Sequence, residues 1–290
     1  LSSPSSAKRY RHGQATIPSD TVCYPAKLRH GHVIDLLDKG VKTIFYPCRS
    51  YNIREKDTEN HYNCPVVAYY SEVIKNNVKQ LRKDDVLYLN DYRNLSEKSH
   101  FAKKAYEHLH AHYPDISLAE VQRATKNAYQ EYKKYEEVIQ QKGLHIIEEA
   151  RKEKKRILVL SGRPYHVDPL INHDIDKLIR GYQCAVVSED IIAHREKNPE
   201  PSNVLNQWTY HSRLYKAANY VAHVDDRQLI QLVSFGCGVD AITSDEVRDI
   251  LERHGKIYTQ VKIDEVTNLG TVRIRLRSLL EALHKKERRK

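Results

Sequence analysis

Apolar and polar positions in the second half of the chain change repeatedly between the strand period and the helix period. Short apolar runs that fit buried strands lie at 157–160, 185–187, 229–233 and 257–263. Segments with helical spacing follow them at 171–179, 204–218, 243–251 and 269–283. Strands that alternate with helices are typical of a parallel sheet. The second half is therefore predicted to form a doubly wound parallel α/β sheet.

The first half shows a weaker version of the same pattern. Helical spacing occurs at 28–37, and strand-like runs follow at 41–46, 66–70 and 86–89. Two helical stretches come next, and the second begins with the capping box Ser117-Leu118-Ala119-Glu120. This helix is predicted to continue to a charged hinge at 152–155. We expect a smaller parallel sheet here, with the long helix joining it to the second half.

These patterns predict a short arm and two lobes. Residues 1–18 are rich in Ser, Lys, Arg and Gly without an apolar period, which indicates a flexible arm. An N-terminal α/β lobe is expected over 19–151 and a C-terminal doubly wound α/β lobe over 152–290. A chain of 290 residues with 40% apolar content can bury the cores of two such domains.

Hydropathy and charge narrow the class of protein. No stretch is long and apolar enough to span a bilayer, and the first residues lack a signal-peptide core, so we expect a soluble cytoplasmic protein without a membrane partner. The net charge is +10, with much of the excess near the two ends, which favours solvated tails. An anionic partner such as a coenzyme phosphate is the alternative. No aromatic-basic recognition motif supports a nucleic-acid partner.

Four of the five cysteines lie in turn-like settings. Cys23, Cys48 and Cys64 stand beside prolines, and Cys237 stands between two glycines. Proline reduces the entropy lost when a loop is tied to a metal, and glycine lets the backbone approach a bulky inorganic group. Cys184, inside an apolar run, is predicted to be a buried structural residue. The other four thiols predict a metal site.

The cysteine spacing leaves the kind of site open. Four thiolates from separate loops can hold one [4Fe-4S] cluster, and three would leave one iron open to a substrate oxygen. No Cys-x-x-Cys pair is present, so spacing does not decide between a cluster and ordinary free cysteines. A structural zinc site ranks lower, because zinc usually takes paired ligands from short knuckles.

A polar loop follows the first strand of the second half and carries Gly162, Arg163, Tyr165, His166 and Asp168. Arg163 fits a phosphate or carboxylate, and His166 and Asp168 could exchange protons. For each residue alone, a hydrogen-bonded turn that anchors the loop is the alternative. Because ligands of doubly wound folds lie at the carboxyl ends of strands, this loop is predicted to bind substrate.

The sequence also lacks two nucleotide-binding motifs. Neither Gly-x-x-x-x-Gly-Lys-Ser/Thr nor Gly-x-Gly-x-x-Gly occurs in the chain. Any ATP-driven step is therefore expected to come from another region or subunit.

Several longer motifs resemble a known family. They are Cys23-Tyr24-Pro25-Ala26-Lys27, His30-Gly31-His32, Asn63-Cys64-Pro65-Val66-Val67, the loop at 162–169, Ser234-Phe235-Gly236-Cys237-Gly238-Val239-Asp240-Ala241 and Lys262-Ile263-Asp264-Glu265. They resemble the C-terminal part of large proteins named CoA-substrate-specific enzyme activases. That part is similar to the 2-hydroxyacyl-CoA dehydratase subunit family. The likeness runs from about Pro18 to Leu283.

The resemblance implies two Rossmann-like or flavodoxin-like lobes with an oxygen-sensitive [4Fe-4S] cluster between them. It implies Cys23, Cys64 and Cys237 as ligands, with Cys48 as the candidate fourth. The dehydratases eliminate water from a 2-hydroxyacyl-CoA through a ketyl radical after one-electron reduction. In the larger proteins an actin-like ATPase activator region supplies the low-potential electron.

Two functions from different classes follow. The first is an iron-sulfur domain for one-electron transfer or radical dehydration, with an ATPase activator region or subunit as partner and an acyl-CoA or another small molecule as substrate. The second is a non-catalytic two-lobed scaffold or partner-binding module. A homo-oligomer is compatible with either function.

Overall fold

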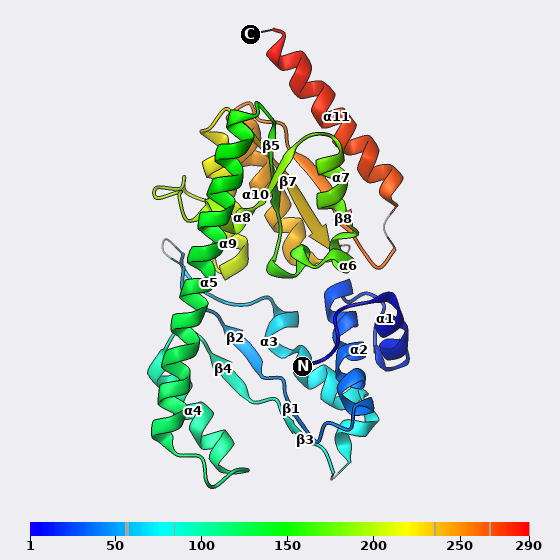
Figure 1. The fold of residues 1–290 in the computed structure, drawn as a ribbon, viewed down its shortest axis with the longest axis vertical. Helices are drawn as coiled ribbons and strands as arrows, with labels where there is room; N and C mark the ends of the chain where they lie inside the picture. The colour runs from blue at the N-terminus through cyan, green and yellow to red at the C-terminus, as the bar shows by residue number, and fades with distance from the viewer. Residues whose placement is uncertain (56–57, 84, 235, 267, 290) are drawn as a thin grey trace. The chain divides into compact units, whose positions relative to one another are not determined.

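The computed structural model describes residues 1–55, 58–83, 85–234, 236–266 and 268–289 and has an α/β architecture (Figure 1). The chain divides into two compact units. Unit 1 is Leu1–Val138 with Asn206–Thr209, and unit 2 is Ile139–Leu205 with Tyr210–Lys290. Both units contain parallel strands and helices, which confirms the predicted fold class. The division between the units lies within the long helix α5 (Leu118–Lys152), whereas the sequence predicts a boundary at its end.

Unit 1 contains two short pairs of parallel strands. Its elements are α1 (Ala7–Gly13), η1 (Gln14–Thr16), α2 (Tyr24–Asp38), β1 (Thr43–Phe45), β2 (Cys48–Tyr51), α3 (Pro65–Asn77), η2 (Lys79–Arg82), β3 (Leu87–Leu89), β4 (Tyr92–Asn94), α4 (Lys98–His110) and the first part of α5. β1 pairs with β3, and β2 pairs with β4. Pro47 separates β1 from β2 because it has no N–H for the ladder. Pairing resumes at Cys48, whose N–H donates to the Asp91 carbonyl at 3.0 Å.

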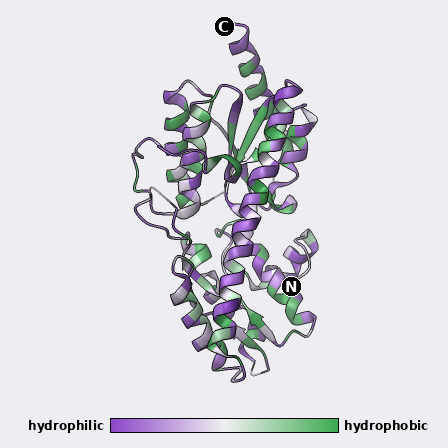
Figure 2. Cartoon of the chain, turned by 60° about the vertical axis from the view of Figure 1, so that its left-hand side comes forward, coloured by the Kyte–Doolittle hydropathy of each residue, from purple (hydrophilic) through white to green (hydrophobic). Residues whose placement is uncertain are grey.

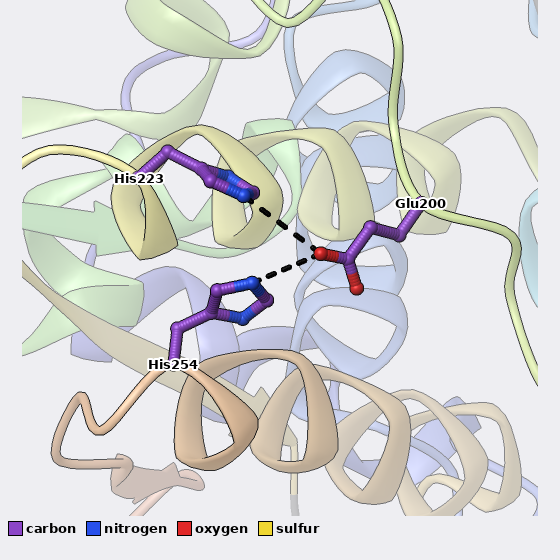
Figure 3. A group of neighbouring side chains, drawn as sticks. All are labelled: Glu200, His223 and His254. Atoms are coloured by element: carbon purple, nitrogen blue, oxygen red, sulfur yellow. Dashed lines mark ion pairs between the residues drawn. The ribbon is translucent and has the colours of Figure 1, made fainter.

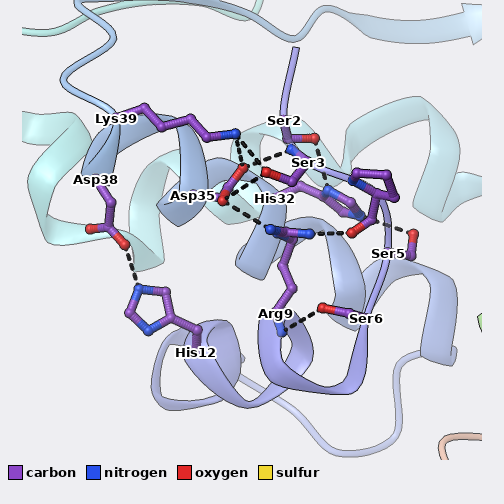
Figure 4. Close-up of polar contacts among 11 residues, drawn as sticks. Ser2, Ser3, Ser5, Ser6, Arg9, His12, His32, Asp35, Asp38 and Lys39 are labelled. Carbon is purple, nitrogen blue, oxygen red and sulfur yellow. Dashed lines mark hydrogen bonds and ion pairs between the residues drawn. The ribbon is translucent and has the colours of Figure 1, made fainter.

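The segment 1–18, predicted to be a flexible arm, contains helix α1, which packs against α2 (Figure 4). Asp35 of α2 accepts hydrogen bonds from Lys39 Nζ at 2.9 Å, the Ser3 amide at 2.8 Å and Arg9 Nη2 at 3.0 Å. The bond from Lys39, followed by the other two, holds the pKa of Asp35 well below its ordinary value. Polar contacts position this segment, which is why its sequence shows no apolar period.

Two glycines allow α1 and α2 to approach closely. A Cβ on Gly13 would lie 2.3 Å from the Gly31 nitrogen, and a Cβ on Gly31 would lie 2.1 Å from the Arg9 carbonyl oxygen. Backbone atoms cannot move aside as a flexible side chain can. We therefore expect Gly31→Ala to cost about 1 to 3 kcal/mol through overpacking, measured by urea unfolding. Gly181→Ala is the control, since no atom lies within 4 Å of its Cβ position; equal effects would contradict the close-packing argument.

Helix α3 stands where a strand is predicted. The β-branched and aromatic run at 66–70 indicates a strand, yet these residues are helical. Pro65 occupies the first turn, where its missing N–H costs nothing. Tyr70 and Ile74 lie four residues apart and are both buried, so the burial has a helical period. Burial and a proline-led start outweigh the strand propensity of individual residues.

The core of unit 1 involves α2, α3, β1 and β3. Its buried members are Ala26, Val33, Ile34, Ile44, Tyr70, Ile74, Val78, Leu81 and Tyr88. The hydroxyl of Tyr88 lies 2.9 Å from Ser71 Oγ, so the polar end of this buried ring has a partner.

Unit 2 contains a four-stranded parallel sheet in the order β6-β5-β7-β8. After the end of α5 its elements are β5 (Ile157–Ser161), η3 (Pro164–Val167), α6 (Pro169–Asn172), α7 (Ile175–Gly181), β6 (Ala185–Ser188), α8 (Glu189–Ala193), α9 (Thr209–Ala222), β7 (Arg227–Ser234), α10 (Gly238–Arg253), β8 (Thr259–Ile263) and α11 (Leu269–Glu287). The strand order is that of flavodoxin-like sheets. The four strands lie at the positions that the apolar runs predict.

Both faces of this sheet are covered. Ile157 and Val159 of β5 pack in one cluster with residues of α8, α9 and α10. Leu158, between them and equally buried, faces the other side, where α7 contacts β6 and α11 contacts β8. Figure 2 shows largely apolar strands in this sheet and a mostly hydrophilic α5. Burial on two faces explains why these strands are continuous apolar runs.

The strand order reverses beside β5. Because β6 lies on one side of β5 and β7 on the other, the carboxyl ends of β5 and β7 form a topological switch point. The loops that leave these two strands carry residues 162–168 and 234–237. Phe235, quoted in the second motif, lies outside the described residues. Both sequence-predicted loops of unit 2 are thus at the edge where doubly wound sheets bind ligands.

Three helical predictions in unit 2 are wrong in detail. The helix predicted at 204–218 begins only at Thr209, as α9. The helical segment at 243–251 predicts a helix start at Thr243, but α10 begins earlier, and Thr243 Oγ1 donates back to the Val239 carbonyl at 2.8 Å. The predicted helix at 171–179 is divided into α6 and α7 at His173, which has a left-handed φ of 53°.

The predicted capping box of α5 is confirmed. Glu120 Oε2 accepts from the Ser117 amide at 2.9 Å, and Ser117 Oγ accepts from the Glu120 amide at 3.3 Å. The helix then continues past Gly143 to Lys152, as predicted. Within the described ranges no helix, α5 included, is long and apolar enough to cross a bilayer.

Candidate functional site

The three motif cysteines share one local position. Cys23, Cys64 and Cys237 are the N-cap residues of α2, α3 and α10, with φ of −60°, −60° and −79°. The carbonyl of each accepts a hydrogen bond from the first turn of its helix. All three thiols are half-buried. The N-terminus of a helix carries partial positive charge, so all three sulfurs lie where an anionic group is favoured.

Prolines place two of these thiols at helix starts. Pro25 and Pro65 lie in the first turns of α2 and α3, where no N–H is required. Cys64 Sγ accepts a hydrogen bond from the Val67 amide at 3.5 Å, as a serine or aspartate cap does elsewhere. Cys64 therefore precedes a helix, and its predicted position just before a strand is wrong.

Arg29 links Cys23 and Cys64 electrostatically within unit 1. Its guanidinium donates to the Tyr46 hydroxyl and lies 5.5 Å from the centre of that ring. Burial opposes the charge of Arg29, whereas Tyr46 favours it. Attraction to Cys23 and Cys64 adds to the second effect, and the net result raises the pKa of Arg29 above its ordinary value. A permanent positive charge thus lies close enough to interact with both sulfurs.

Cys48 has a different environment. The sequence places it at the carboxyl end of a strand, but it opens β2 instead and is fully buried. Burial raises the pKa of its thiol, and the nearby charges of Glu72 and Asp91 add to the increase. Burial likewise raises the pKa of Cys184, which lies just before β6 as a buried structural residue. The surroundings of Cys48 favour a neutral thiol, and its role as a ligand stays a prediction.

Arg163 and Asp240 form a buried ion pair at the switch point of unit 2. Arg163 Nη1 and Nη2 donate to Asp240 Oδ1 and Oδ2 at 2.5 and 2.6 Å, and both side chains are 4% exposed. Nη2 also donates to Ser234 Oγ at 3.1 Å, and Nη1 lies 3.6 Å from Cys237 Sγ. Burial opposes the charge of Arg163, but Tyr165 and then Asp240 and Cys237 outweigh it and raise the pKa. A charged guanidinium is therefore fixed beside this sulfur.

The turn that carries Cys237 is tied to the same carboxylate. Asp240 Oδ2 accepts from the Ser234 amide at 2.7 Å, which joins the end of β7 to the first turn of α10. Gly236 has a left-handed φ of 71°, which glycine adopts readily. Beside Gly238 the space is open, since no atom lies within 4 Å of its Cβ position. The glycines around this thiol thus form a turn on one side and leave room on the other.

Gly162 and His166 pack against each other. A Cβ on Gly162 would lie 2.3 Å from His166 Nδ1, which accepts from the Arg163 amide at 3.0 Å. Burial, followed by the charge of Arg163, holds the pKa of His166 well below its ordinary value. The Gly162 amide donates to Glu189 Oε2 at 3.3 Å, and burial raises the pKa of that carboxyl to about 8. His166 is therefore a neutral ring that shapes the loop.

Tyr165 and Asp168 complete the predicted substrate loop. The ring of Tyr165 lies 5.1 Å from Arg163 Cζ, a cation–π contact. Asp168 caps α6, with Oδ1 accepting from two first-turn amides at 2.8 and 3.3 Å. These contacts of Arg163, His166 and Asp168 are internal and match the anchored turn that the sequence left as the alternative. Substrate binding by the loop stays a prediction.

Three residues of these sites are not among the predicted site residues, namely Arg29, Ser234 and Asp240, although the last two belong to a motif that carries the family resemblance. Asp240 lies in the first turn of the helix that Cys237 begins, and a carboxylate at that position is a usual partner for a helix start. The three-residue spacing from Cys237 to Asp240 is therefore the sequence signal that indicates Asp240. No local pattern pairs Arg29 with Cys64 or Arg163 with Asp240, because each pair forms only through tertiary packing.

A family model described as CoA enzyme activase uncharacterised domain (DUF2229) matches residues 1–192. The matched segment includes Cys23, Cys64 and the loop at 162–168, whereas Cys237 lies beyond it. A search of curated proteins found no match. Since the matched segment is well over half of the 290 residues, the chain belongs to the CoA enzyme activase uncharacterised domain family.

Proposed function

We propose that this chain is a cytoplasmic [4Fe-4S] domain that works with an ATPase activator region or subunit in one-electron chemistry on an acyl-CoA. Cys23, Cys64 and Cys237 are the proposed ligands. Family membership supports the activase part of this function. The observation that carries the iron-sulfur part is the N-cap position that the three cysteines share, with a charged arginine near each.

The donor set fits an iron-sulfur cluster chemically. Cluster iron binds thiolates, and helix N-termini and arginines favour the deprotonated sulfur. Amide hydrogen bonds to sulfur, such as that from Val67 to Cys64, are among the contacts that tune cluster potentials. When bound, a cluster would supply one-electron transfer.

The chain's own residues would prepare the site. Asp240 holds Arg163 in place, so the positive charge beside Cys237 is fixed before any ligand arrives. The open space at Gly238 gives a bulky group access to the same turn. In unit 1, Arg29 supplies the corresponding charge. Guanidinium groups that are already held near the sulfurs lower the cost of orienting donors when an anionic group binds.

The test is iron and acid-labile sulfide content after anaerobic purification. About four of each per chain are expected in the wild type, as for a Cys-ligated cubane cluster. Cys237→Ser is expected to lose them, and Cys184→Ser is the matched control, because Cys184 is buried beside β6. Cys48→Ala decides whether the fourth ligand is a protein thiolate. A folded wild type without iron after reconstitution would overturn the proposal.

The second candidate is a non-catalytic two-lobed scaffold. It is favoured by the internal contacts of Arg163, His166 and Asp168, which engage most polar groups of the predicted substrate loop. Anaerobic assays with an acyl-CoA and a reduced ATPase activator separate the two functions. Turnover supports the dehydratase-like function, whereas an iron-loaded protein without turnover supports an electron carrier or scaffold.

A further inference from the structure

Glu200, His223 and His254 form a cluster on unit 2 whose ligand atoms all lie within 4.8 Å of one another (Figure 3). Glu200 Oε1 lies 2.9 Å from His254 Nε2 and 3.8 Å from His223 Nε2. We propose that these three side chains bind a divalent transition metal of the zinc class. His254 and Cys237 flank opposite ends of the 16-residue helix α10, which is about 24 Å long at 1.5 Å per residue. The proposed site is thus distinct from Cys237.

Two helix ends bring the imidazoles together. His223 directly follows α9, and His254 is the C-cap of α10. The ring centres are 4.6 Å apart, and Figure 3 shows both rings pointing to the Glu200 carboxylate. The carboxyl end of a helix carries partial negative charge, so two such ends favour a cation between them.

The ring orientation defines which nitrogen faces the carboxylate. His223 Nδ1 lies 2.8 Å from the Asn219 carbonyl oxygen, and His254 Nδ1 lies 2.9 Å from the Ile250 carbonyl oxygen. A carbonyl only accepts, so the hydrogen of each neutral ring is on Nδ1 and the lone pair is on Nε2. Both lone pairs then point at Glu200. The lone pairs and the carboxylate repel one another unless protons or a metal ion lie between them. A backbone carbonyl that accepts from Nδ1–H is the usual partner of a metal-binding histidine.

The distances fit a tetrahedral metal. With metal–ligand bonds of about 2.0 to 2.1 Å, neighbouring ligand atoms are about 3.3 Å apart. The observed separations from Glu200 Oε1, 2.9 and 3.8 Å, lie on either side of this value. The side chain of His223 is 54% exposed, so the fourth position can be filled from solvent. Two histidines and one carboxylate with an open position are a recurrent zinc ligand set.

The carboxylate is held in place before any metal binds. The Glu200 amide donates to Asn219 Oδ1 at 3.2 Å, and the Asn203 amide in the same loop donates to Glu246 Oε1 at 3.0 Å. Asn219 and Glu246 are buried on α9 and α10, so the loop is attached to both histidine-bearing helices. Arg253 Nη1 lies 3.7 Å from Glu200 Oε2, which leaves Oε1 for the metal.

The test is titration of the full chain with Co²⁺, followed by displacement with Zn²⁺. We expect one Co²⁺ with the visible d–d bands of a tetrahedral nitrogen and oxygen site and without thiolate-to-cobalt charge transfer. His223→Gln and His254→Gln are each expected to weaken binding about tenfold or more. His145→Gln, at an exposed histidine on α5, is the matched control. Cys23→Ser and Cys237→Ser should leave the d–d bands unchanged.

Three results would overturn the proposal. They are folded wild type that binds no Co²⁺, bound Co²⁺ that shows only thiolate charge transfer, and equal weakening by the His145 and His254 variants. Circular dichroism checks that each variant is folded. If a histidine variant unfolds, Glu200→Gln replaces it, because the backbone bond to Asn219 remains. Loss of iron binding by the cysteine variants bears on the proposed function alone.

Discussion

Replacing Asp240 by asparagine is expected to destabilise the protein by about 3 to 5 kcal/mol, because a buried charge loses its partner. Arg163 is 4% exposed, and an arginine cannot lose its proton to avoid the cost. An amide keeps the shape of the carboxylate but not its two accepting oxygens. Both oxygens accept from Arg163, and Oδ2 also accepts from the Ser234 amide. Whichever way the amide turns, its NH₂ group faces a donor.

Urea unfolding of the wild type and Asp240→Asn measures this cost. The control is Asp245→Asn, which removes a carboxylate that is 74% exposed and pairs with Arg248 at 3.0 Å. That change is expected to stay within about 0.5 kcal/mol. The double variant Arg163→Met/Asp240→Leu should be more stable than Asp240→Asn, since no unpaired charge remains. Similar free energies for Asp240→Asn and Asp245→Asn would show that the buried pair does not anchor the turn.

The sheet of unit 2 could be predicted because each of its strands appears in the sequence as its own apolar run. β5 and β7 are buried on both faces, so they appear as unbroken apolar runs. The loops at their ends could then be assigned to the ligand edge from topology alone. In unit 1 the run at 66–70 carries strand-forming residues on a helix, and only Pro65 and the four-residue spacing from Tyr70 to Ile74 indicate the true period.

The side-chain partners could not be predicted because they come from distant segments. Arg163 meets Asp240, and Glu200 meets His223 and His254, only once the helices of unit 2 have packed. No spacing motif connects these positions, unlike a zinc knuckle or a capping box. Glycine and proline neighbours predict the cysteines as ligands from sequence alone, but their helix N-cap geometry needs the fold. The helix within 1–18 has no apolar period in the sequence because polar contacts, which have no period, hold it to α2.

Acidification is expected to destabilise the folded chain as the pH falls from about 6.5 toward 4. His30 of unit 1 is fully buried, with its nitrogens 3.0 Å from the Tyr70 hydroxyl and 2.8 Å from Thr16 Oγ1. Burial lowers the pKa of His30 from 6.5 to about 4. In unit 2, burial followed by the charge of Arg163 lowers the pKa of His211 to about 3.

The sign follows from proton uptake on unfolding. Above the ordinary pKa of 6.5 both states hold these rings neutral, so no stability is lost. Below it the unfolded rings bind protons while the folded rings do not, and stability falls until the pH reaches the folded pKa values. At about 1.36 kcal/mol per pKa unit, His30 removes about 3 kcal/mol and His211 about 5 kcal/mol at full effect.

Unfolding free energies measured in urea between pH 7.5 and pH 4.5 would show this dependence. His30→Gln removes one of the protons taken up, so its free energy should fall less steeply with acid than that of the wild type, whatever its stability at pH 7. His145→Gln, at an exposed ring, should leave the slope unchanged. If His30→Gln and the wild type have the same slope, protonation of His30 does not oppose folding. The slope, rather than the stability at one pH, isolates this ring, because a packing defect shifts the free energy equally at every pH.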